Sequence, residues 1–388
     1  MDEVGAVVVD TGSGSVKVGF SGEDTPRGIF QTSLGTPRNP EWLLAHHGGL
    51  KPDRDYFVGK DCAAVREHLE VIDPVVRGTV TDWEAMEKVW DYMFEHELRM
   101  NPEAVNMPVL STMSPPTAKA QLAKTAQLMF ESYKATAFYS MQTCVLSLFA
   151  SGRTRGIVVE AGHGSSHAVP IFEGYALPHA TLHLPVGGFD ITKHLELLLA
   201  KSGHSLKSFH PSIFSDMKES HCYTVSGNTA PPHEANKPFE LPDGSIITIN
   251  SECRAKATDV LFEATTLPDD HPARNSKSLP DLIVQSISMC DKDLQHDLRG
   301  AVVLAGGTTM IPGLSKRLHD ELRPRLRESD IRLVPDYETR ERGYNTHRRM
   351  AAWIGGSMFA SLPTFKDIQI TRQEWEESHE AILDRKCF

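Results

Sequence analysis

Two segments of the 388-residue chain follow the same order of residue types. Residues 7–20 read VVVDTGSGSVKVGF, and residues 158–170 read VVEAGHGSSHAVP. Each contains an apolar run, an acidic residue, a small residue, a Gly-x-Gly turn and a second run. The second run alternates between apolar and polar residues, which predicts a returning strand, so each segment predicts a β-hairpin. A weak repeat at this distance favours two related domains.

Length and charge limit the classes of function. At roughly 150 residues per domain, the chain has room for two or three domains. The formal charge of −11 argues against direct binding of nucleic acid, because such binding needs clustered Lys and Arg. The acidic N-terminus does not fit a signal peptide, no apolar run approaches the ~20 residues of a membrane span, and the six cysteines are scattered. We expect a soluble intracellular protein that does not enter membranes.

Periodicity and turn signals predict the remaining elements. Residues 36–57 read as a loop-rich excursion, and residues 266–279 as an exposed loop. A capping box of Thr81 and Glu84 is predicted to begin the first helix. The other predictions are helices over 81–98, 117–132, 141–152 and 187–203, an extended piece over 135–140, a hairpin over 239–249 turning at Asp243-Gly244, a buried strand in 300–310, and a helix after Pro312.

The first Gly-rich turn has the residue types needed to bind phosphate and a metal ion. Gly12 and Gly14 allow backbone N–H groups to approach an anion closely. Asp10 ends the first strand, where a carboxylate can hold a hydrated Mg²⁺ through its waters. Further donors to phosphate are Ser13, Ser15 and Lys17. For one copy alone, a plain glycine hairpin is the simpler interpretation.

The second copy changes that balance. Glu160, Gly162 and Gly164 repeat the order acid, Gly, x, Gly after an equally apolar strand, so two hairpins can bind one polyphosphate. A third element, residues 306–309, reads GGTT between a strand and a helix start, a place that suits a nucleoside or phosphate edge. The P-loop and the Rossmann fingerprint are both absent from the sequence.

These features together resemble the superfamily of actin, Hsp70 and the sugar kinases, and within it the actin family. The strings that carry the resemblance are GGTTMIPG (306–313), WIGGSMFASL (353–362), LSLFASGRT (146–154), YALPHA (175–180) and RKCF (385–388), in actin order. The resemblance covers essentially the whole chain. It implies an α/β, actin-like fold of two lobes, with ATP or ADP and Mg²⁺ or Ca²⁺ in a cleft between duplicated β-sheet domains.

The same resemblance implies domain boundaries. The first lobe has its core in residues 1–31, 73–150 and 351–388, with a small loop-rich subdomain, 32–72, inserted. The second lobe has its core in residues 151–186 and 276–350, with a subdomain, 187–275, inserted.

Site residues follow from the resemblance, motif by motif. Asp10 and Glu160 would hold the metal through water. Lys218 and Glu219 would approach the ribose and base, and Arg349 stands where the family has a Lys near the base. The full cofactor-binding set is Thr11, Gly12, Ser13, Gly14, Ser15, Lys17, Gly162, His163, Gly164, Ser165, Ser166, Gly188, Lys218, Glu219, Gly306, Gly307, Thr308, Met310 and Arg349.

Two departures from the family pattern concern hydrolysis. His163 replaces an acid inside the second Gly-x-Gly, and Thr143 falls where the family has the glutamine that positions water. Gln142 stands one place early, which on a helix is a rotation of about 100°, so we expect that it does not substitute. His167 does match the family's histidine. Losing an outer-shell acceptor typically lowers metal affinity or activity 10 to 100-fold, so the resemblance implies at most a slow ATPase.

His163 leaves alternatives open: it donates directly to a phosphate and favours retention of nucleotide, or it is a surface residue without consequence. The function is open as well. The HHGG stretch (46–49), the polar 266–279 segment and the long 335–349 segment depart from features used in polymerisation. They favour a subunit of a defined assembly over a filament former. The lack of a basic targeting run favours a cytoskeletal assembly, associated with microtubules, dynein or a cilium, in the cytoplasm. Its partners would be the other subunits, including actin or dynein-associated proteins. The alternatives are a filament-forming ATPase, a nuclear chromatin-remodelling subunit and a sugar-kinase-like enzyme.

Overall fold

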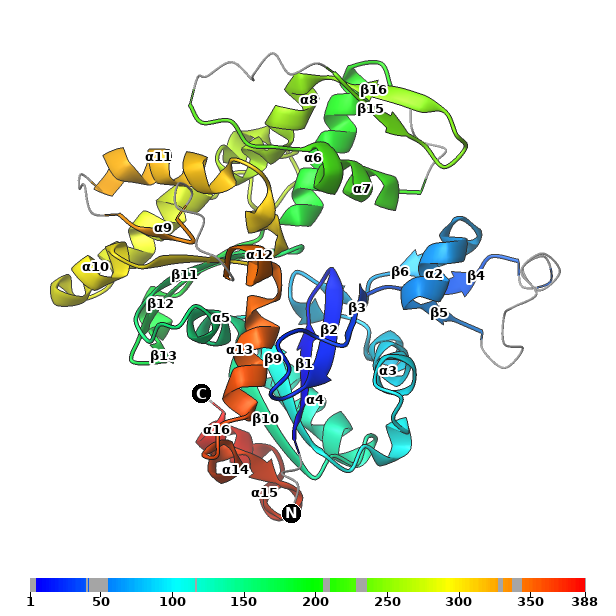
Figure 1. Cartoon of the computed structure of the whole chain (residues 1–388), viewed down its shortest axis with the longest axis vertical. Coiled ribbons are helices and arrows are strands. Elements are labelled where there is room, and N and C mark those ends of the chain that lie inside the picture. The colour runs from blue at the N-terminus through cyan, green and yellow to red at the C-terminus, as the bar shows by residue number, and fades with distance from the viewer. Residues whose placement is uncertain are drawn as a thin grey trace. The chain divides into compact units, whose positions relative to one another are not determined.

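The structure is a computed structural model in which the chain divides into two compact units. It describes residues 5–39, 41, 55–115, 117–204, 210–227, 236–326, 331–336 and 344–387. Unit 1 comprises Met1–Ala150 and Met350–Phe388, and unit 2 comprises Ser151–Arg349 (Figure 1). Across these described ranges, the helices are all too short or too polar to cross a bilayer.

Unit 1 is built on a sheet with the strand order β19-β10-β9-β1-β2-β3. β1 pairs antiparallel with β2 and parallel with β9, and β9 pairs parallel with β10. The predicted first hairpin is confirmed. The strands are β1 (Val7–Thr11), β2 (Ser15–Phe20), β3 (Gly28–Gln31), β9 (Pro108–Met113), β10 (Ala137–Gln142) and β19 (Ile370–Thr371).

Unit 2 is built on a sheet with the order β13-β12-β11-β17-β18, in which β14 also pairs with β12. β11 pairs antiparallel with β12 and parallel with β17, as β1 does with β2 and β9. The second hairpin is therefore confirmed, and the two sheets share one topology around it. The strands are β11 (Gly156–Ala161), β12 (Ser166–Phe172), β13 (Tyr175–Ala176), β14 (Leu182–Leu184), β17 (Val302–Ala305) and β18 (Leu333–Val334).

Helices cover both faces of the unit 1 sheet, because the buried strands carry apolar residues on both faces. Val7 and Val9 pack with α3 and α4, whereas Val8 packs with Trp353 of α13. Gly355 of α13 approaches α5 so closely that a Cβ would lie 1.9 Å from Leu146 O. The helices are α3 (Trp83–Tyr92), continued by the π-turn η2 (Met93–Glu97), α4 (Lys119–Glu131), α5 (Thr143–Ala150) and α13 (Ala351–Ala360).

Two predicted helix starts in unit 1 are wrong. The cap of α3 is Asp82, whose carboxylate accepts from Ala85 N at 3.0 Å, so the predicted capping box of Thr81 and Glu84 does not form. The Thr81 hydroxyl donates instead to Pro74 O. α5 begins only at Thr143, because β10 continues in register with β9 through the residue before it.

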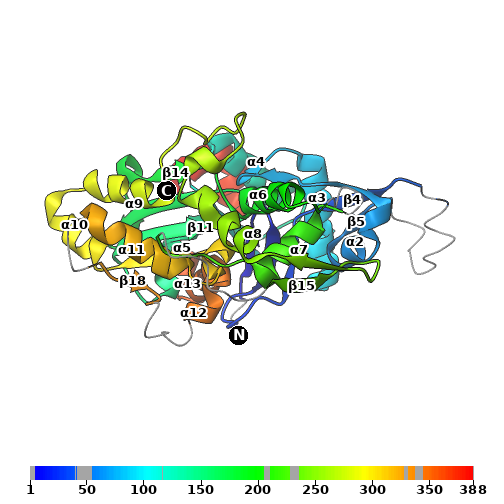
Figure 2. The same ribbon diagram turned by 90° about the horizontal axis from the view of Figure 1, so that it is seen from above.

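The remaining parts of unit 1 are short. A three-stranded sheet has the order β5-β4-β6, and β7 and β8 form a separate hairpin. Helix α2 lies beside β4 and β5 (Figure 2). Most of the predicted 36–57 excursion, including the HHGG stretch, lies outside the described residues. The elements are β4 (Leu34–Pro37), β5 (Phe57–Val58), α2 (Gly59–Val65), β6 (Leu69–Ile72), β7 (Val75–Val76), β8 (Thr79–Val80), α14 (Phe365–Ile368), α15 (Arg372–Ser378) and α16 (Leu383–Lys386).

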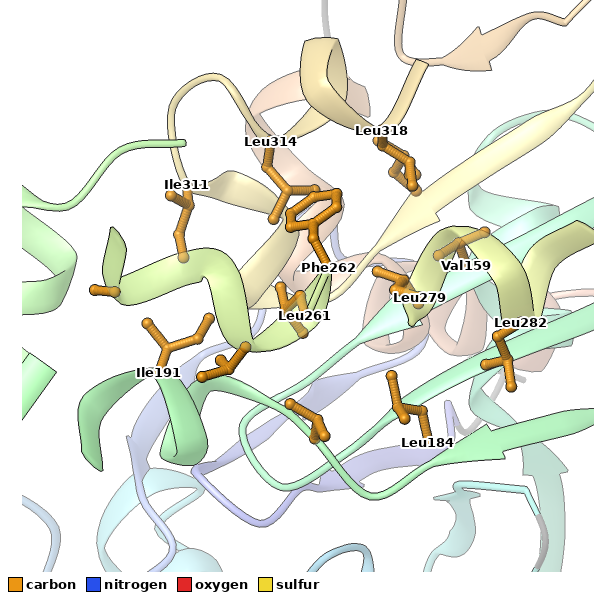
Figure 3. Packing of buried hydrophobic residues seen from close by; sticks show 14 of the residues in the cluster. Val159, Leu184, Ile191, Leu261, Phe262, Leu279, Leu282, Ile311, Leu314 and Leu318 are labelled. Carbon is orange, nitrogen blue, oxygen red and sulfur yellow. The ribbon is translucent and has the colours of Figure 1, made fainter. Parts of the chain in front are cut away.

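One hydrophobic core joins the helices of unit 2 to its sheet. Ile191 of α6, Leu261 of η5 and Leu314 of α11 are all buried in this cluster (Figure 3). The helices are α6 (Gly188–Lys201), α7 (Ser212–His221), α8 (Ser251–Lys256), η5 (Ala257–Leu261), η6 (Ala264–Thr266), α9 (Leu279–Ser288), α10 (Lys292–Arg299), η7 (Gly307–Met310), α11 (Leu314–Leu326) and α12 (Tyr344–His347). The predicted hairpin is confirmed as β15 (Lys237–Glu240) and β16 (Ile246–Ile249), with Gly244 at φ +80° in its turn.

One prediction in unit 2 needs correction. The segment 266–279 is irregular as expected but is not simply exposed, because Leu267 and Ala273 are buried in the core. The buried strand predicted within 300–310 is confirmed as β17, which ends at Ala305 because Gly306 turns the chain at φ +90° into the short helix η7.

Candidate functional site

The first Gly-rich turn closes on itself at the end of β1. Gly12 N donates to Ser15 O at 3.1 Å. Thr32 clamps the turn from outside: its hydroxyl donates to Gly12 O at 2.7 Å and its N–H donates to Gly14 O at 3.3 Å. Thr32 is fully buried and is not among the predicted site residues. A lone Thr after a short strand has no motif that reveals such a role.

Two side chains of the first turn are fixed by neighbouring elements. Ser13 Oγ accepts from Gly78 N at 2.8 Å, in the turn between β7 and β8 where Gly78 has φ +83°. Because the hydroxyl accepts in this bond, its own proton remains to be donated. Thr11 Oγ1 accepts from the indole N–H of Trp90 at 3.3 Å. The turn is therefore held on both sides by other parts of unit 1.

Asp10 is buried beneath this turn and is held by two donors. Its Oδ2 accepts from Lys17 Nζ at 2.9 Å, and its Oδ1 accepts from Thr112 Oγ1 at 2.6 Å. Thr112, at the end of the neighbouring strand β9, is not among the predicted residues. A carboxylate has about four acceptor positions, so these two bonds leave positions for the water shell of a cation. The donor set therefore fits a hydrated metal.

The two residues considered for positioning water lie on different elements. Gln142 is the last residue of β10, paired with Met113 of β9, and Thr143 is the first residue of α5 and is buried. The expected helical rotation of 100° between them is therefore wrong. The Gln142 Oε1 atom is buried without a hydrogen-bond partner.

The second Gly-rich turn closes in the same way as the first. Gly162 N donates to Ser165 O at 2.9 Å, after a strand that ends in Glu160 and Ala161. Glu160 is half-buried and faces His167 across β11 and β12. The Ser166 hydroxyl donates to Val186 O at 2.8 Å, so this proton is directed into unit 2.

Three chain segments meet at this second turn. Gly162 O accepts from Gly188 N at 2.9 Å, at the start of α6, and from Thr308 Oγ1 at 2.8 Å, in the GGTT element. Phe189 N donates to His163 O at 2.8 Å. The predicted residues of the turn, Gly188 and the GGTT element are thus brought together within unit 2.

Glycine is required at this junction for steric reasons. A Cβ on Gly187 would lie 2.6 Å from His163 O and 2.7 Å from Ser165 N, both of them backbone atoms. At Gly306 the backbone has φ +90°, and a Cβ would lie 2.3 Å from Ala161 O. Backbone atoms cannot move away as a flexible side chain can, so larger residues would open the turn. Gly187 is not among the predicted residues.

His163 is half-buried and packs against the start of α6. Its ring contacts Phe189 edge to face, with the centroids 6.0 Å apart. The backbone and the ring of His163 are thus both in contact with the start of α6.

Lys218 is buried against the start of α6. Its Nζ donates to Gly188 O at 3.1 Å and to Thr192 Oγ1 at 2.9 Å, and burial lowers its pKa. Lys218 therefore stabilises the Gly187-Gly188 pair at the start of α6. Glu219, the next residue on α7, is exposed.

The GGTT element is held in place by Arg348, which is not among the predicted site residues. Arg348 donates from Nε to Thr309 Oγ1 at 3.1 Å and from Nη2 to Thr309 O at 2.6 Å, and its own carbonyl accepts from Gly306 N at 3.0 Å. Burial lowers the pKa of Arg348. Arg349, which the resemblance places near the base, is exposed, as is Gly307, and Met310 is half-buried.

Metal coordination by several side chains is not indicated in the part of the chain that the structure describes. There, His, Cys, Asp and Glu form no group of three or more suited to a metal ion. A cation at Asp10 would accordingly keep most of its water shell, as Mg²⁺ commonly does.

Comparison with known protein families gives one match that bears on this geometry. The family model described as Actin matches residues 1–388, the whole chain.

Proposed function

This chain belongs to the actin family, whose members generally bind nucleotide and a divalent cation, and on that premise we propose that its two closed Gly-rich turns bind ATP or ADP with Mg²⁺ or Ca²⁺. The observation that carries the proposal is the shared closure of the turns. The bonds from Gly12 N to Ser15 O and from Gly162 N to Ser165 O lie at the same place in two sheets that share one strand order around the hairpin.

The residues of both turns fit a triphosphate. Ser13 retains a hydroxyl proton to donate, and the glycines leave room for an anion to approach the backbone. Asp10, and Glu160 in the second unit, would accept from the waters of the cation. When bound, the cation neutralises phosphate charge. Lys17 would serve as a point charge beside the phosphates, held in place by Asp10.

We propose that hydrolysis is slow or absent. Thr143 is buried at the helix start and has a short side chain where the family has a glutamine that positions water. His163 has an imidazole where the family has an acid, and its ring packs on Phe189. A carboxylate that accepts from water is missing at that place. The remaining residues of the two turns are suited to binding nucleotide without hydrolysing it.

We propose further that the protein is a structural subunit of a cytoskeletal assembly in the cytoplasm, associated with microtubules, dynein or a cilium. The choice of a cytoskeletal assembly rests on the lack of a basic targeting run in the sequence. Segment 266–279 supports a subunit that does not form filaments. Its apolar residues Leu267 and Ala273 are buried in unit 2, whereas residues 268–270 are exposed and include two acids. A segment of this kind offers little apolar surface to a neighbouring subunit in a filament.

A combined binding and sedimentation experiment tests these proposals. Mg-ATP at 100 times its Kd should add about 2.7 kcal/mol of stability and raise the melting temperature. The protein should stay in the supernatant on centrifugation with Mg-ATP and salt, and should release phosphate slowly. No change in melting would count against nucleotide binding. Pelleting with prompt release would instead support a filament-forming ATPase, and ATP consumption with a small hydroxylated substrate would support a kinase.

A different experiment is needed to identify the assembly to which the protein belongs. Native purification with identification of the co-eluting proteins should recover cytoskeletal subunits. Recovery of chromatin-remodelling subunits from nuclei would overturn the proposed location.

A further inference from the structure

A buried hydrogen bond connects segment 266–279 to the start of α6. His271 Nε2 lies 2.9 Å from Asp190 Oδ1, and the two side chains are only 11% and 3% exposed. The residues are 81 positions apart in the sequence, so this contact is made by the tertiary fold.

The other carboxylate oxygen of Asp190 reaches the junction at the second turn. Asp190 Oδ2 accepts from the N–H of Gly187, the residue before α6, at 2.8 Å. Gly187 is the residue whose missing Cβ allows the close approach to His163 O and Ser165 N. One carboxylate therefore connects the 266–279 segment to the backbone against which the turn packs.

The other ring nitrogen of His271 fixes the orientation of the imidazole. His271 Nδ1 accepts from Ala273 N at 3.0 Å, and Ala273 is fully buried. Because Nδ1 accepts, the proton of the neutral ring lies on Nε2 and is donated to Asp190. The ring and the carboxylate are thus both held by backbone groups of buried residues.

We propose that His271 is a positioning residue for nucleotide binding: through Asp190 it holds the Gly187-Gly188 pair against the second turn, and so sets the affinity for the phosphates. The inference rests on the proposed function. It also makes segment 266–279 a place where contact with another molecule changes nucleotide affinity. By thermodynamic linkage, bound nucleotide then steadies this segment in return.

Three substitutions of His271 separate the two bonds of the ring. In His271→Gln the side-chain amide nitrogen falls near the place of Nε2, so the bond to Asp190 is kept. In His271→Asn the shorter side chain can accept from Ala273 N but does not reach Asp190. His271→Ala loses both bonds. Arg274→Ala is the matched control, because Arg274 bonds to Leu267 O and pairs with Asp269 within the same segment.

The Kd for Mg-ATP of the full chain is measured for each variant, together with amide hydrogen exchange of residues 187–189 without nucleotide. We expect the Gln variant to resemble the wild type. The Asn and Ala variants should bind about tenfold more weakly, the loss typical of an outer-shell partner, and should exchange faster at 187–189. Arg274→Ala should leave the Kd within about twofold.

Two results would overturn the inference while the proposed function stands: an Asn variant that binds like wild type, or an Arg274→Ala variant that weakens binding as much as His271→Ala. A measurement on the wild type tests the inference even if the variants do not fold. In the wild type, Mg-ATP should slow hydrogen exchange in residues 267–274, and unchanged exchange there also overturns the inference. A wild type that does not bind Mg-ATP rejects the proposed function together with the inference.

Discussion

Lys17 Nζ lies 2.9 Å from Asp10 Oδ2, and the two residues face each other across the first hairpin. Both side chains are mostly buried, at 15% and 9% exposed. Thr112 donates to the other oxygen of the same carboxylate. The ammonium group is therefore held at the end of β1, next to the first Gly-rich turn, and the carboxylate is kept in one orientation.

Lys17→Met should weaken both stability and nucleotide binding. The substitution leaves a buried carboxylate with one donor fewer, which costs about 2 kcal/mol, and it removes a charge from beside the phosphates. We expect at least a tenfold rise in the Kd for Mg-ATP, measured by calorimetric titration. Lys88→Met is the control, because the pair of Lys88 with Glu84 is exposed and contributes about 0 to 1 kcal/mol. Equal Kd values for Lys17→Met and wild type would remove Lys17 from the site.

Gly187→Ala should open the second turn. The added Cβ would lie 2.6 to 2.9 Å from three backbone atoms, so the turn and the start of α6 must separate. Overpacking of this kind typically costs about 1 to 3 kcal/mol, and Mg-ATP binding should fall with it. Thermal unfolding and titration measure the two effects. Gly300→Ala, whose Cβ would lie 3.5 Å from Asp297 O, should keep wild-type stability. A stable Gly187→Ala protein that binds normally would contradict the steric interpretation.

His167 makes the stability of the protein depend on pH. Burial, followed by the charge of His183, lowers its pKa to about 3. In the unfolded chain the value is about 6.5, so below that pH the unfolded state takes up a proton that the folded state does not. Stability therefore falls as the pH drops from 6.5 towards 3. At pH 5 the loss is about 2 kcal/mol.

His167→Gln should remove this part of the pH dependence, because the amide stays neutral. Urea unfolding at pH 7.5 and pH 5 measures it. The wild type should lose about 2 kcal/mol more than the variant between the two values. A difference of equal size in both proteins would show that other groups cause the acid destabilisation.

Local patterns were sufficient to predict the two hairpins. Strand alternation and a Gly-x-Gly turn are properties of neighbouring residues, and the turns form as those residues favour. The same is true of the hairpin that turns at Gly244. Prediction failed for the cap of α3, where Thr81 has the right residue type but donates to Pro74 O. Thr81 does not cap the helix because its N–H and its hydroxyl both donate to Pro74 O, across the hairpin of β7 and β8.

The supports of the candidate site could not be predicted, because they come from distant parts of the chain. Thr112 is 102 residues from Asp10, and Arg348 is 39 residues from Thr309. No local spacing encodes such pairs. Resemblance to a family predicted a role for Arg349 near the base of the nucleotide. It did not predict that Arg348, the residue before it, donates to the GGTT element. Gly187 was missed for a similar reason, since its role depends on a backbone approach that only the fold creates.

We attribute slow hydrolysis to the residues at positions 142, 143 and 163. Moving the glutamine amide by one position should therefore help to restore hydrolysis. The swap Gln142→Thr with Thr143→Gln keeps the composition and places the glutamine where the resemblance expects it. Combined with His163→Asp, which returns a carboxylate that accepts from water, it should raise the rate of phosphate release at least about tenfold. His163→Asp alone should give a smaller increase, because the water would still lack its positioning amide.

Phosphate release is measured under single-turnover conditions with Mg-ATP, and the Kd is measured in parallel. Because Gln142 lies on β10 and Thr143 begins α5, the swap changes a strand end and a helix start, and thermal unfolding must show that both survive. The swap without His163→Asp is the matched control. If the triple variant binds Mg-ATP as the wild type does and still releases no phosphate, residues 142, 143 and 163 do not account for slow hydrolysis. The block on hydrolysis would then lie elsewhere in the two units.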